Sequence, residues 1–244
     1  MTDGWVQIFI QHWRRRDKLK KCLVAFAKAL DFPGEIHVMI QGEQSSLEDL
    51  NVEMPYRVHY LGPNRGCFYP RWYAARFLAT APFVVFWDDD IYPPPGAISR
   101  LLGPLLSGDA DVVVAGVPRL NAGRLDVKGG CLWLHRMPLK QWTIVDYTGF
   151  GASAFKREVF EKCEFDPEYR VGGGDLDMSL QLKEAGLKVG VLPIPGIVHD
   201  SGGDPVYKAE RWNPQYIEAS WKRFKKKWKV RDVQRIFAEE GGTE

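Results

Sequence analysis

Three consecutive carboxylates, Asp88-Asp89-Asp90, follow directly after the apolar run Phe83–Trp87. Aromatic and β-branched residues of this kind favour a buried strand, so the three acids are expected together at its carboxyl end. Carboxylates this close raise each other's pKa values unless a cation neutralises them. Mg²⁺ and Mn²⁺ prefer such oxygen ligands and commonly bridge them to substrate phosphates. The triplet therefore predicts a divalent-metal site or a cluster of basic groups, with a solvated acidic turn as the alternative.

A second acidic pair, Asp175 and Asp177, follows the three glycines 172–174. The leucines that come next recur at helical spacing, so both acids are expected in the first turn of a helix, beside the positive end of its dipole. An N-cap role is the structural alternative for Asp175. Three glycines exceed what a cap needs, and they leave room for a ligand against the backbone.

The elements around these acids predict that further polar groups reach the same edge of a sheet. Val6–Ile10 reads as a first strand, 17–30 as a helix and Ile36–Ile40 as a second strand, which implies a parallel β-α-β unit with a right-handed crossover. Open α/β sheets bind ligands at the carboxyl edge, so the polar turn 11–16 is predicted to line the site. His199 lies between a late apolar run and a Gly-rich loop, which favours a metal role over a structural one.

The remaining elements are predicted from the same periodicities. They are a strand at 58–61, a helix at 72–78, a helix at 98–105 that Pro104 shortens or kinks, a strand at 112–117, a short helix at 156–160 and a strand at 189–192. Between 118 and 148 the periodicity is weak, and a stretch of that length in a compact domain is usually functional. Trp133 and Trp142 in this stretch offer flat faces to a sugar or a base, or pack as core or subunit contacts.

The composition is that of an ordinary globular protein, with 45% hydrophobic and 26% charged residues in a chain of 244. At this length we expect one α/β domain. No apolar run approaches a membrane span, and the first residues lack the pattern of a signal peptide. The four cysteines are widely spaced, which argues against a zinc site and suits free thiols in a reducing compartment. These features predict a cytoplasmic protein without a transmembrane segment.

The positive charge of the chain is concentrated near its end. Residues 222–231 hold seven bases and no acid, so the rest of the chain carries 26 bases against 31 acids. The apolar positions Ile217, Trp221, Phe224 and Trp228 fall on one helical stripe. This pattern predicts an amphipathic helix whose apolar side packs on the core and whose basic side is solvated. A nucleic-acid-binding helix remains the alternative.

The order of these features resembles the nucleotide-sugar-dependent transferases of the GT-A fold, and most closely glycosyltransferase family 2. The segment from Val6 to Leu23 is similar to that family's first strand, donor loop and first helix. Asn64-Arg65-Gly66 resembles its Asn-x-Gly turn, and Phe86 to Asp90 its DxD motif. Residues 172–180 resemble its Gly-Gly-Glu-Asp-x-Asp-x-x-Leu segment, and His199 its late histidine. The resemblance covers nearly the whole chain, including the aromatic and basic ending 221–228.

The resemblance implies roles for individual residues. Asp90 would bind Mn²⁺ or Mg²⁺ directly, Asp88 would contact the ribose or the metal shell, and His199 would complete the metal site. Asp175 would be the general base. The positions expected around the donor nucleotide are Gln11, His12, Arg14, Gln41, Arg65, Asp88 and Asp89. The acceptor is expected near Trp133, Gly173, Gly174 and Asp177.

The function implied is metal-dependent transfer of a sugar from a UDP-sugar to an acceptor hydroxyl, with inversion at the anomeric carbon. The expected fold is GT-A, with a Rossmann-like, mostly parallel sheet flanked by helices. Within one domain, residues 1–117 would form the donor half, 118–204 the acceptor and catalytic half, and 205–244 a helical tail. Gln41 stands where the family usually has an acid that holds uracil.

Three other functions compete with this one. A retaining GT-A transferase and a non-catalytic module that binds nucleotide sugars or glycans remain alternatives. A haloacid-dehalogenase phosphatase needs its DxD motif on the first strand and a Thr or Val where this chain has Tyr92, so it is disfavoured. The acceptor is expected to be a glycan, with a protein, a small molecule or a nucleic-acid base left open.

Overall fold

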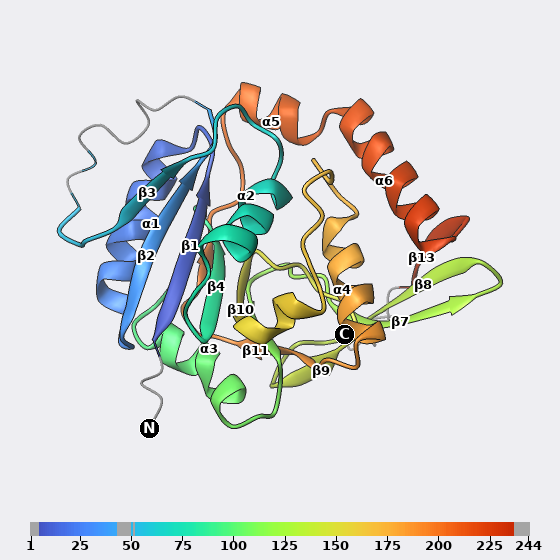
Figure 1. Ribbon diagram of the computed structural model, residues 1–244, viewed down its shortest axis with the longest axis horizontal. Coiled ribbons are helices and arrows are strands. Elements are labelled where there is room, and N and C mark those ends of the chain that lie inside the picture. Colours follow the sequence, from blue (N-terminus) through green and yellow to red (C-terminus); the bar gives the residue numbers. More distant parts are fainter. Residues whose placement is uncertain (1–4, 43–49, 51, 237–244) are drawn as a thin grey trace, which may run out of the picture.

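The computed structural model describes residues 5–42, 50 and 52–236, and its centre is a twisted eight-stranded sheet (Figure 1). The strand order is β3-β2-β1-β4-β10-β6-β11-β9. The strands are β1 Val6–His12, β2 Gly34–Ile40, β3 Arg57–Tyr60, β4 Phe83–Asp88, β6 Val112–Gly116, β9 Thr143–Val145, β10 Ala152–Lys156 and β11 Val189–Pro193. Neighbours β3, β2, β1 and β4 run parallel, as do β6 and β11, so the predicted mostly parallel sheet is confirmed.

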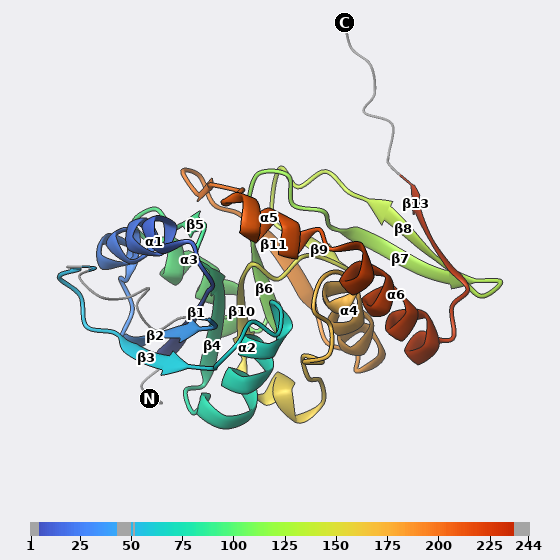
Figure 2. The same cartoon turned by 90° about the horizontal axis from the view of Figure 1, so that it is seen from above.

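Helices cover both faces of this sheet (Figure 2). They are α1 Arg16–Ala29, α2 Phe68–Tyr73, the π-helical turn η2 Ala74–Leu78, α3 Ala97–Leu106, the 3₁₀ helix η3 Arg157–Glu161, α4 Gly174–Glu184, α5 Pro205–Arg211 and α6 Pro214–Trp228. Pro104 lies within α3, one turn from its end, and the following Ser107 ends the helix. Of the described helices, none is long and apolar enough to cross a membrane.

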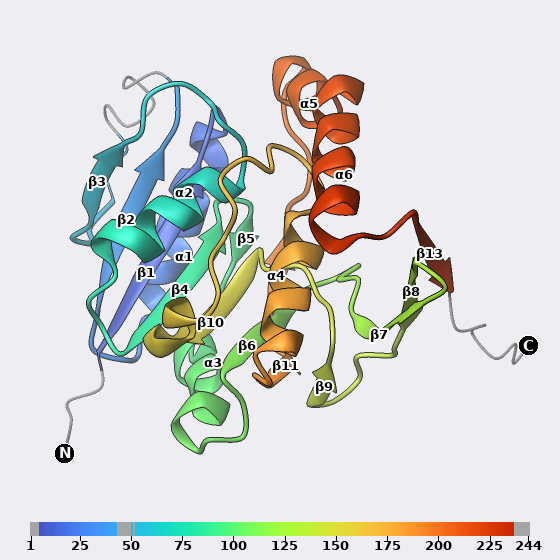
Figure 3. The ribbon, with the colours of Figure 1, turned by 45° about the vertical axis from the view of Figure 1, so that its right-hand side comes forward.

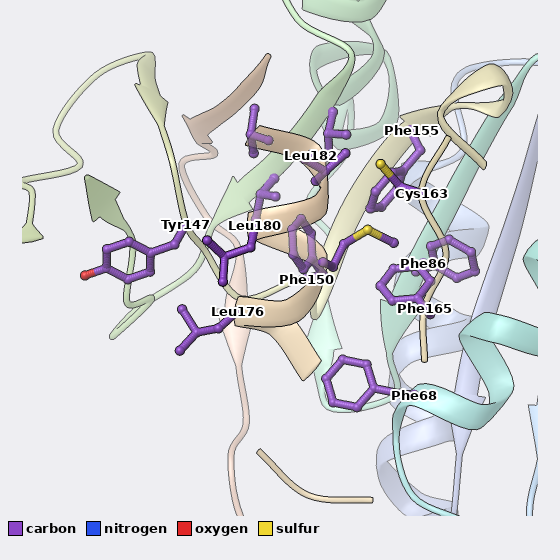
Figure 4. Packing of buried hydrophobic residues seen from close by; sticks show 14 of the residues in the cluster. Phe68, Phe86, Tyr147, Phe150, Phe155, Cys163, Phe165, Leu176, Leu180 and Leu182 are labelled. Carbon is purple, nitrogen blue, oxygen red and sulfur yellow. The ribbon is translucent and has the colours of Figure 1, made fainter. Parts of the chain in front are cut away.

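Alternating residues of the central strands pack into two separate cores, one on each face of the sheet. On β4, Val84 and Phe86 face the core under α2 and α4, whereas Val85 and Trp87 face the core under α1 and α3. Figure 4 shows Phe86 next to Phe165 among the aromatic rings of the first core, with the leucines of α4 beyond Phe150. This two-residue period determines on which side of the sheet each acid after Trp87 lies.

Strands β9 and β10 are the parts of the sheet that the sequence analysis does not predict. The residues of β10 are mostly small, and they form an antiparallel strand between β4 and β6. Small side chains suit this position because both faces of the strand are covered, and Ser153 satisfies its buried hydroxyl by donating to the Phe150 carbonyl at 2.9 Å.

The stretch of weak periodicity also proves to be ordered. It contains the antiparallel hairpin β7 Gly123–Lys128 and β8 Cys131–Arg136, to which β13 Asp232–Ile236 adds a parallel third strand (Figure 3). Trp142 packs directly over Gly190 of β11, so its structural alternative is the one observed. A two-stranded ribbon of β5 Ile91–Tyr92 and β12 Val198–His199 lies beside the carboxylate triplet.

Helix α6 confirms the predicted amphipathic helix. Phe224 is fully buried in the core under α4, with Trp221 and Trp228 packed against it. Three cations of the basic run are engaged within the protein: Arg223 with Asp166 at 2.7 Å, Lys227 with Asp177 at 2.8 Å and Lys225 with Asp232 at 4.0 Å. Residues 237–244 of the predicted tail lie outside the described part.

Asp177 anchors this helix rather than facing an acceptor. Its side chain is 1% exposed and accepts hydrogen bonds from Lys227 and Trp228 at 2.8 Å each, Gln181 at 2.8 Å and Tyr169 at 3.3 Å. Both carboxylate oxygens are therefore committed to internal donors. In this structure Asp177 is buried beneath α6, so its carboxylate is not open to the acceptor that we predicted there.

The substitution Asp177→Asn should destabilise the protein by about 2 kcal/mol, since it removes the charge that four donors share and leaves at least one of them unsatisfied. Chemical denaturation at neutral pH measures the change. Glu158→Gln, on the exposed side of η3, is the control and should stay within about 0.5 kcal/mol of the parent. Equal stability of the two variants would contradict the anchoring role.

Candidate active site

The carboxylate triplet is split between the two faces of the sheet. Asp88, the last residue of β4, follows the side of Phe86 and meets α2: it accepts a hydrogen bond from Arg71 at 2.9 Å and another from Gln11. Asp89 turns to the α1 side, where it is fully buried, lies 2.6 Å from His12 Nδ1 and pairs with Arg15. The triplet therefore does not form one cluster of three equivalent ligands.

Arg15 is the cation that the triplet required. Its guanidinium forms ion pairs with Asp89 and Asp90 together, and its plane lies over the Tyr207 ring at 4.4 Å. Burial, together with the charges of Asp88 and Asp89, raises the pKa of Asp90 to about 6, although Arg15 opposes the shift. The sequence-based expectation of a basic group is thus met by Arg15 of the first loop, which is not among the predicted site residues.

A cavity of about 160 Å³ opens beside these residues. Its walls come from the carboxyl ends of β1, β2 and β4, from the turn 64–67 and from α5. Gln41 holds this turn: its Oε1 accepts from the Arg65 amide at 2.7 Å and its Nε2 donates to the Gly66 carbonyl at 2.9 Å. Gln41 therefore shapes the pocket wall through the turn as well as lining it.

Asp175 lies near the pocket, linked to it by one guanidinium. Arg71 is 4% exposed and its side chain bridges Asp88 at 2.9 Å and Asp175 at 3.7 Å. The Phe150 amide donates to Asp175 Oδ1 at 3.2 Å, which fixes the carboxylate without making it an N-cap; the cap position of α4 is Gly173. Desolvation raises the pKa of Asp175, and Arg71 and the Phe150 amide oppose that rise.

The glycines before Asp175 serve packing rather than a ligand. A Cβ at Gly174 would lie 2.6 Å from the Phe68 ring, and one at Gly173 would lie 3.2 Å from Tyr169 at a positive φ of 76°. The space that we predicted for an acceptor at Gly173 and Gly174 is occupied by these two side chains. The run of glycines lets α4 begin against α2, which places Asp175 within reach of Arg71.

Two of the predicted metal ligands lie together. His199 Nε2 is 3.8 Å from Asp90 Oδ2, and Asp90 Oδ1 is buried with no hydrogen-bond partner. Across residues 5–42, 50 and 52–236, no group of three or more Cys, His, Asp and Glu side chains forms a metal site. An orphaned carboxylate oxygen beside an imidazole nevertheless fits a divalent cation that takes its other ligands from substrate phosphates and water.

Three predicted residues lie elsewhere. Arg14, in the left-handed region at φ 64°, turns outward to Asp204 at 3.4 Å. Arg65 is exposed and its guanidinium stacks on Tyr69 at 4.1 Å, so only its backbone amide joins the pocket wall. Trp133 lies on β8, on the opposite side of the strand from the buried Leu132 and Leu134. None of the three side chains lines the described cavity.

Sequence reasoning missed Arg71 and the residues that reach the pocket from α5. Arg71 lies just before the helix predicted at 72–78, and its guanidinium packs between the rings of Phe68 and Phe165. Tyr207, Glu210 and Arg211 reach the cavity from α5, whose start is capped by Asp204 accepting from the Tyr207 amide at 2.7 Å. The Asp204-Pro205 pair is a helix-start signal that could have identified α5.

The chain matches the family described as Glycosyl transferase family 2 over residues 8–163, more than half of its length. It belongs to glycosyltransferase family 2. The matched region of this family 2 chain contains the first loop, the Asn-x-Gly turn, Arg71 and the carboxylate triplet. Asp175 and His199 lie beyond it. The comparison with curated proteins gave no match.

Solved structures agree on the fold. TarS 1–349 from S. aureus superposes with a TM-score of 0.58 at 16% identity, over 77% of this chain and 57% of that chain. A mycobacterial protein gives a TM-score of 0.59 at 17% identity, over 85% of this chain and 71% of that chain. The family 2 chain thus spans little more than half of the TarS fragment. Together with the family match, this confirms the GT-A fold expected from the sequence.

Replacing Arg71 by Met should lower the free energy of unfolding by about 3 kcal/mol, because Asp88 and Asp175 lose their shared buried counter-charge. Urea denaturation at pH 7 measures this. Arg100→Met, on the exposed side of α3, is the matched control and should change stability by less than about 0.5 kcal/mol. If both variants unfold at the same urea concentration, Arg71 does not hold the two carboxylates together.

Proposed function

We propose that this chain is a metal-dependent inverting glycosyltransferase that moves a sugar from a UDP-sugar to an acceptor hydroxyl, with Asp175 as the general base. The observation that carries the proposal is the bridge Asp88–Arg71–Asp175. One buried guanidinium holds a carboxylate of the pocket at 2.9 Å and a second, more exposed carboxylate at 3.7 Å. A donor-binding group and a candidate base are thereby kept at a fixed separation.

Different residues of the chain would neutralise charge, bind the diphosphate and hold the metal in this reaction. Arg15 and Arg71 neutralise the carboxylates at the end of β4, which keeps the pocket from repelling an anionic donor. Arg211 and Arg170 also line the cavity, where cations suit a diphosphate. Asp90 and His199 would hold the divalent cation, which when bound neutralises the leaving diphosphate.

Asp175 is suited to take the proton of the attacking hydroxyl. Its side chain is 44% exposed, so an acceptor can reach it, while the Phe150 amide fixes its orientation. Its raised pKa makes the carboxylate a better base than a fully solvated aspartate. In a direct displacement, the hydroxyl oxygen bonds to the anomeric carbon as the bond to the diphosphate breaks, and the proton passes to Asp175.

The donor and acceptor are proposed at different levels of detail. Gln41 takes the place of the acid expected to hold uracil, and its amide is already engaged by the turn 64–66, so UDP is supported by the family rather than by this residue.

A glycan acceptor is favoured over nucleic acid, because Arg223, Lys225 and Lys227 of the basic helix pair with acids of the protein itself. A cytoplasmic location stays a prediction.

The base assignment predicts a specific loss of chemistry. Asp175→Asn keeps the size of the side chain but cannot take a proton, so transfer from UDP-sugars should fall by about 10²- to 10⁴-fold. UDP release in the presence of Mn²⁺ and mixed acceptors measures the rate, and thermal shift with UDP should show unchanged donor binding. Asp126→Asn on the exposed hairpin serves as the control.

Unimpaired transfer by Asp175→Asn would remove this residue as the base. The configuration of the product at the anomeric carbon, determined by NMR, separates an inverting from a retaining enzyme. A protein that binds UDP with metal but never turns over a donor would instead be the non-catalytic module.

Removing the metal should abolish most donor binding. With Mn²⁺ present, UDP at about 100 times its dissociation constant should stabilise the fold by about 2.7 kcal/mol, and EDTA should remove that gain. Asp90→Asn should lose the metal-dependent part of the thermal shift, whereas Asp126→Asn should retain it. An identical shift by UDP in Mn²⁺ and in EDTA would contradict the roles assigned to Asp90 and His199.

A further inference from the structure

An aromatic surface runs along α2 and η2 on the side turned away from Asp88. Tyr69 and Trp72 have ring centroids 5.7 Å apart, Trp72 and Phe77 lie edge to face at 5.4 Å, and Phe77 also contacts Tyr73 at 5.1 Å. Phe77 is 59% exposed, and Tyr69, Trp72 and Tyr73 are half-buried. A contiguous apolar surface of this kind is a candidate interaction site.

A hollow of about 210 Å³ lies beside this surface, and it shares no lining residue with the cavity at the candidate active site. Trp72, Phe160 and Phe165 form its apolar walls, and Ala75 and Ala79 widen it. Both alanines lie at the π-helical turn, where the Ala79 amide reaches back to the Ala74 carbonyl. Such turns are rare and frequently occur at functional sites.

The remaining lining residues are two arginines and two glutamates, Arg76, Arg157, Glu161 and Glu164. In the described part of the chain these four side chains make no ion pair or side-chain hydrogen bond with one another or with other residues. Their charges sum to zero. The hollow thus combines flat apolar walls with guanidinium donors and carboxylate acceptors that have no partner among the described residues.

We propose that this hollow and the adjoining aromatic surface, formed by α2, η2 and η3, bind a neutral saccharide chain. A sugar ring presents an apolar C–H face that fits an aromatic wall, and vicinal hydroxyls that both donate to carboxylates and accept from guanidinium groups. Glu161 and Glu164 repel a phosphate backbone, and the neutral balance gives no attraction to an anionic surface. The chemistry therefore selects an uncharged polyol.

The hollow is coupled to the candidate active site by packing. Phe165, which lines it, lies under the Arg71 guanidinium with 5.9 Å between the guanidinium carbon and the ring centroid. Figure 4 shows Phe165 next to Phe68, the ring against which α4 begins. Saccharide binding in the hollow does not require that the chain be a transferase. The further role of this saccharide as an anchored acceptor rests on the proposed function.

The test measures binding without turnover. Maltohexaose, cellohexaose and chitohexaose are titrated into the full chain, with heparin and a single-stranded oligonucleotide as anionic probes, and calorimetry reports affinity. We expect at least one neutral oligosaccharide to bind, and Trp72→Ala to weaken it at least about tenfold. Trp212→Ala, which removes a tryptophan 67% exposed on α5, should leave this affinity unchanged.

Because Trp72 also packs on the core, the exposed pair Arg157→Gln and Glu164→Gln provides a second variant that should fold normally and lose about tenfold in affinity. UDP binding by both variants should stay at the parent value, which distinguishes this site from the proposed function. Binding of the anionic probes alone, failure of all three neutral probes to bind, or undiminished binding by the double variant would each overturn the proposal.

Discussion

The structure depends on neutralising three adjacent carboxylates at the end of one buried strand. Asp89 is fully buried and Asp90 is 5% exposed, so neither can rely on water to stabilise its charge. Arg15 supplies one cation from the α1 side of the sheet, and Arg71 supplies another from the α2 side. Each arginine is held by aromatic rings, Tyr207 for the first and Phe68 and Phe165 for the second. The same two cations that stabilise the fold thereby shape the pocket's charge.

Much of this arrangement could be predicted from local sequence. The strand before Asp88, the first β-α-β unit, the helix that begins at Asp175 and the amphipathic α6 all follow from periodicity, and each is observed. His199 lies 3.8 Å from Asp90, and its role as a metal ligand stays a prediction. The observed helices and strands follow from local periodicity, and parallel strands bring their carboxyl ends to one edge, so chain order places the loops that follow them.

The predictions that differ from the structure have a different cause. Contacts between segments far apart in the sequence determine the partners of each polar side chain. Arg14 and Arg15 are neighbours of identical type, and only the backbone turn at Arg14 determines which one reaches the acids. Asp177 has the sequence signature of a site residue, yet Lys227 and Trp228 of α6, 50 and 51 residues later, bind its carboxylate. Strand β10 lacks any alternation because both its faces are buried, so its small residues resemble a loop. None of these outcomes is encoded within a short window of sequence.

The double use of α2 follows from its amphipathic geometry and explains why its aromatic content is high. Its inner side must carry Phe68 and Arg71 to bridge Asp88 and Asp175, which fixes the helix against the sheet and against α4. Its outer side carries Trp72 and Tyr73, which pack in part against a core already filled by Phe86, Phe155 and Phe165. The following turn η2 carries the exposed Phe77. Trp72 thus has two roles, because it packs on the core and forms a wall of the hollow proposed as a saccharide site. Arg71, the preceding residue of α2, holds Asp88 and Asp175.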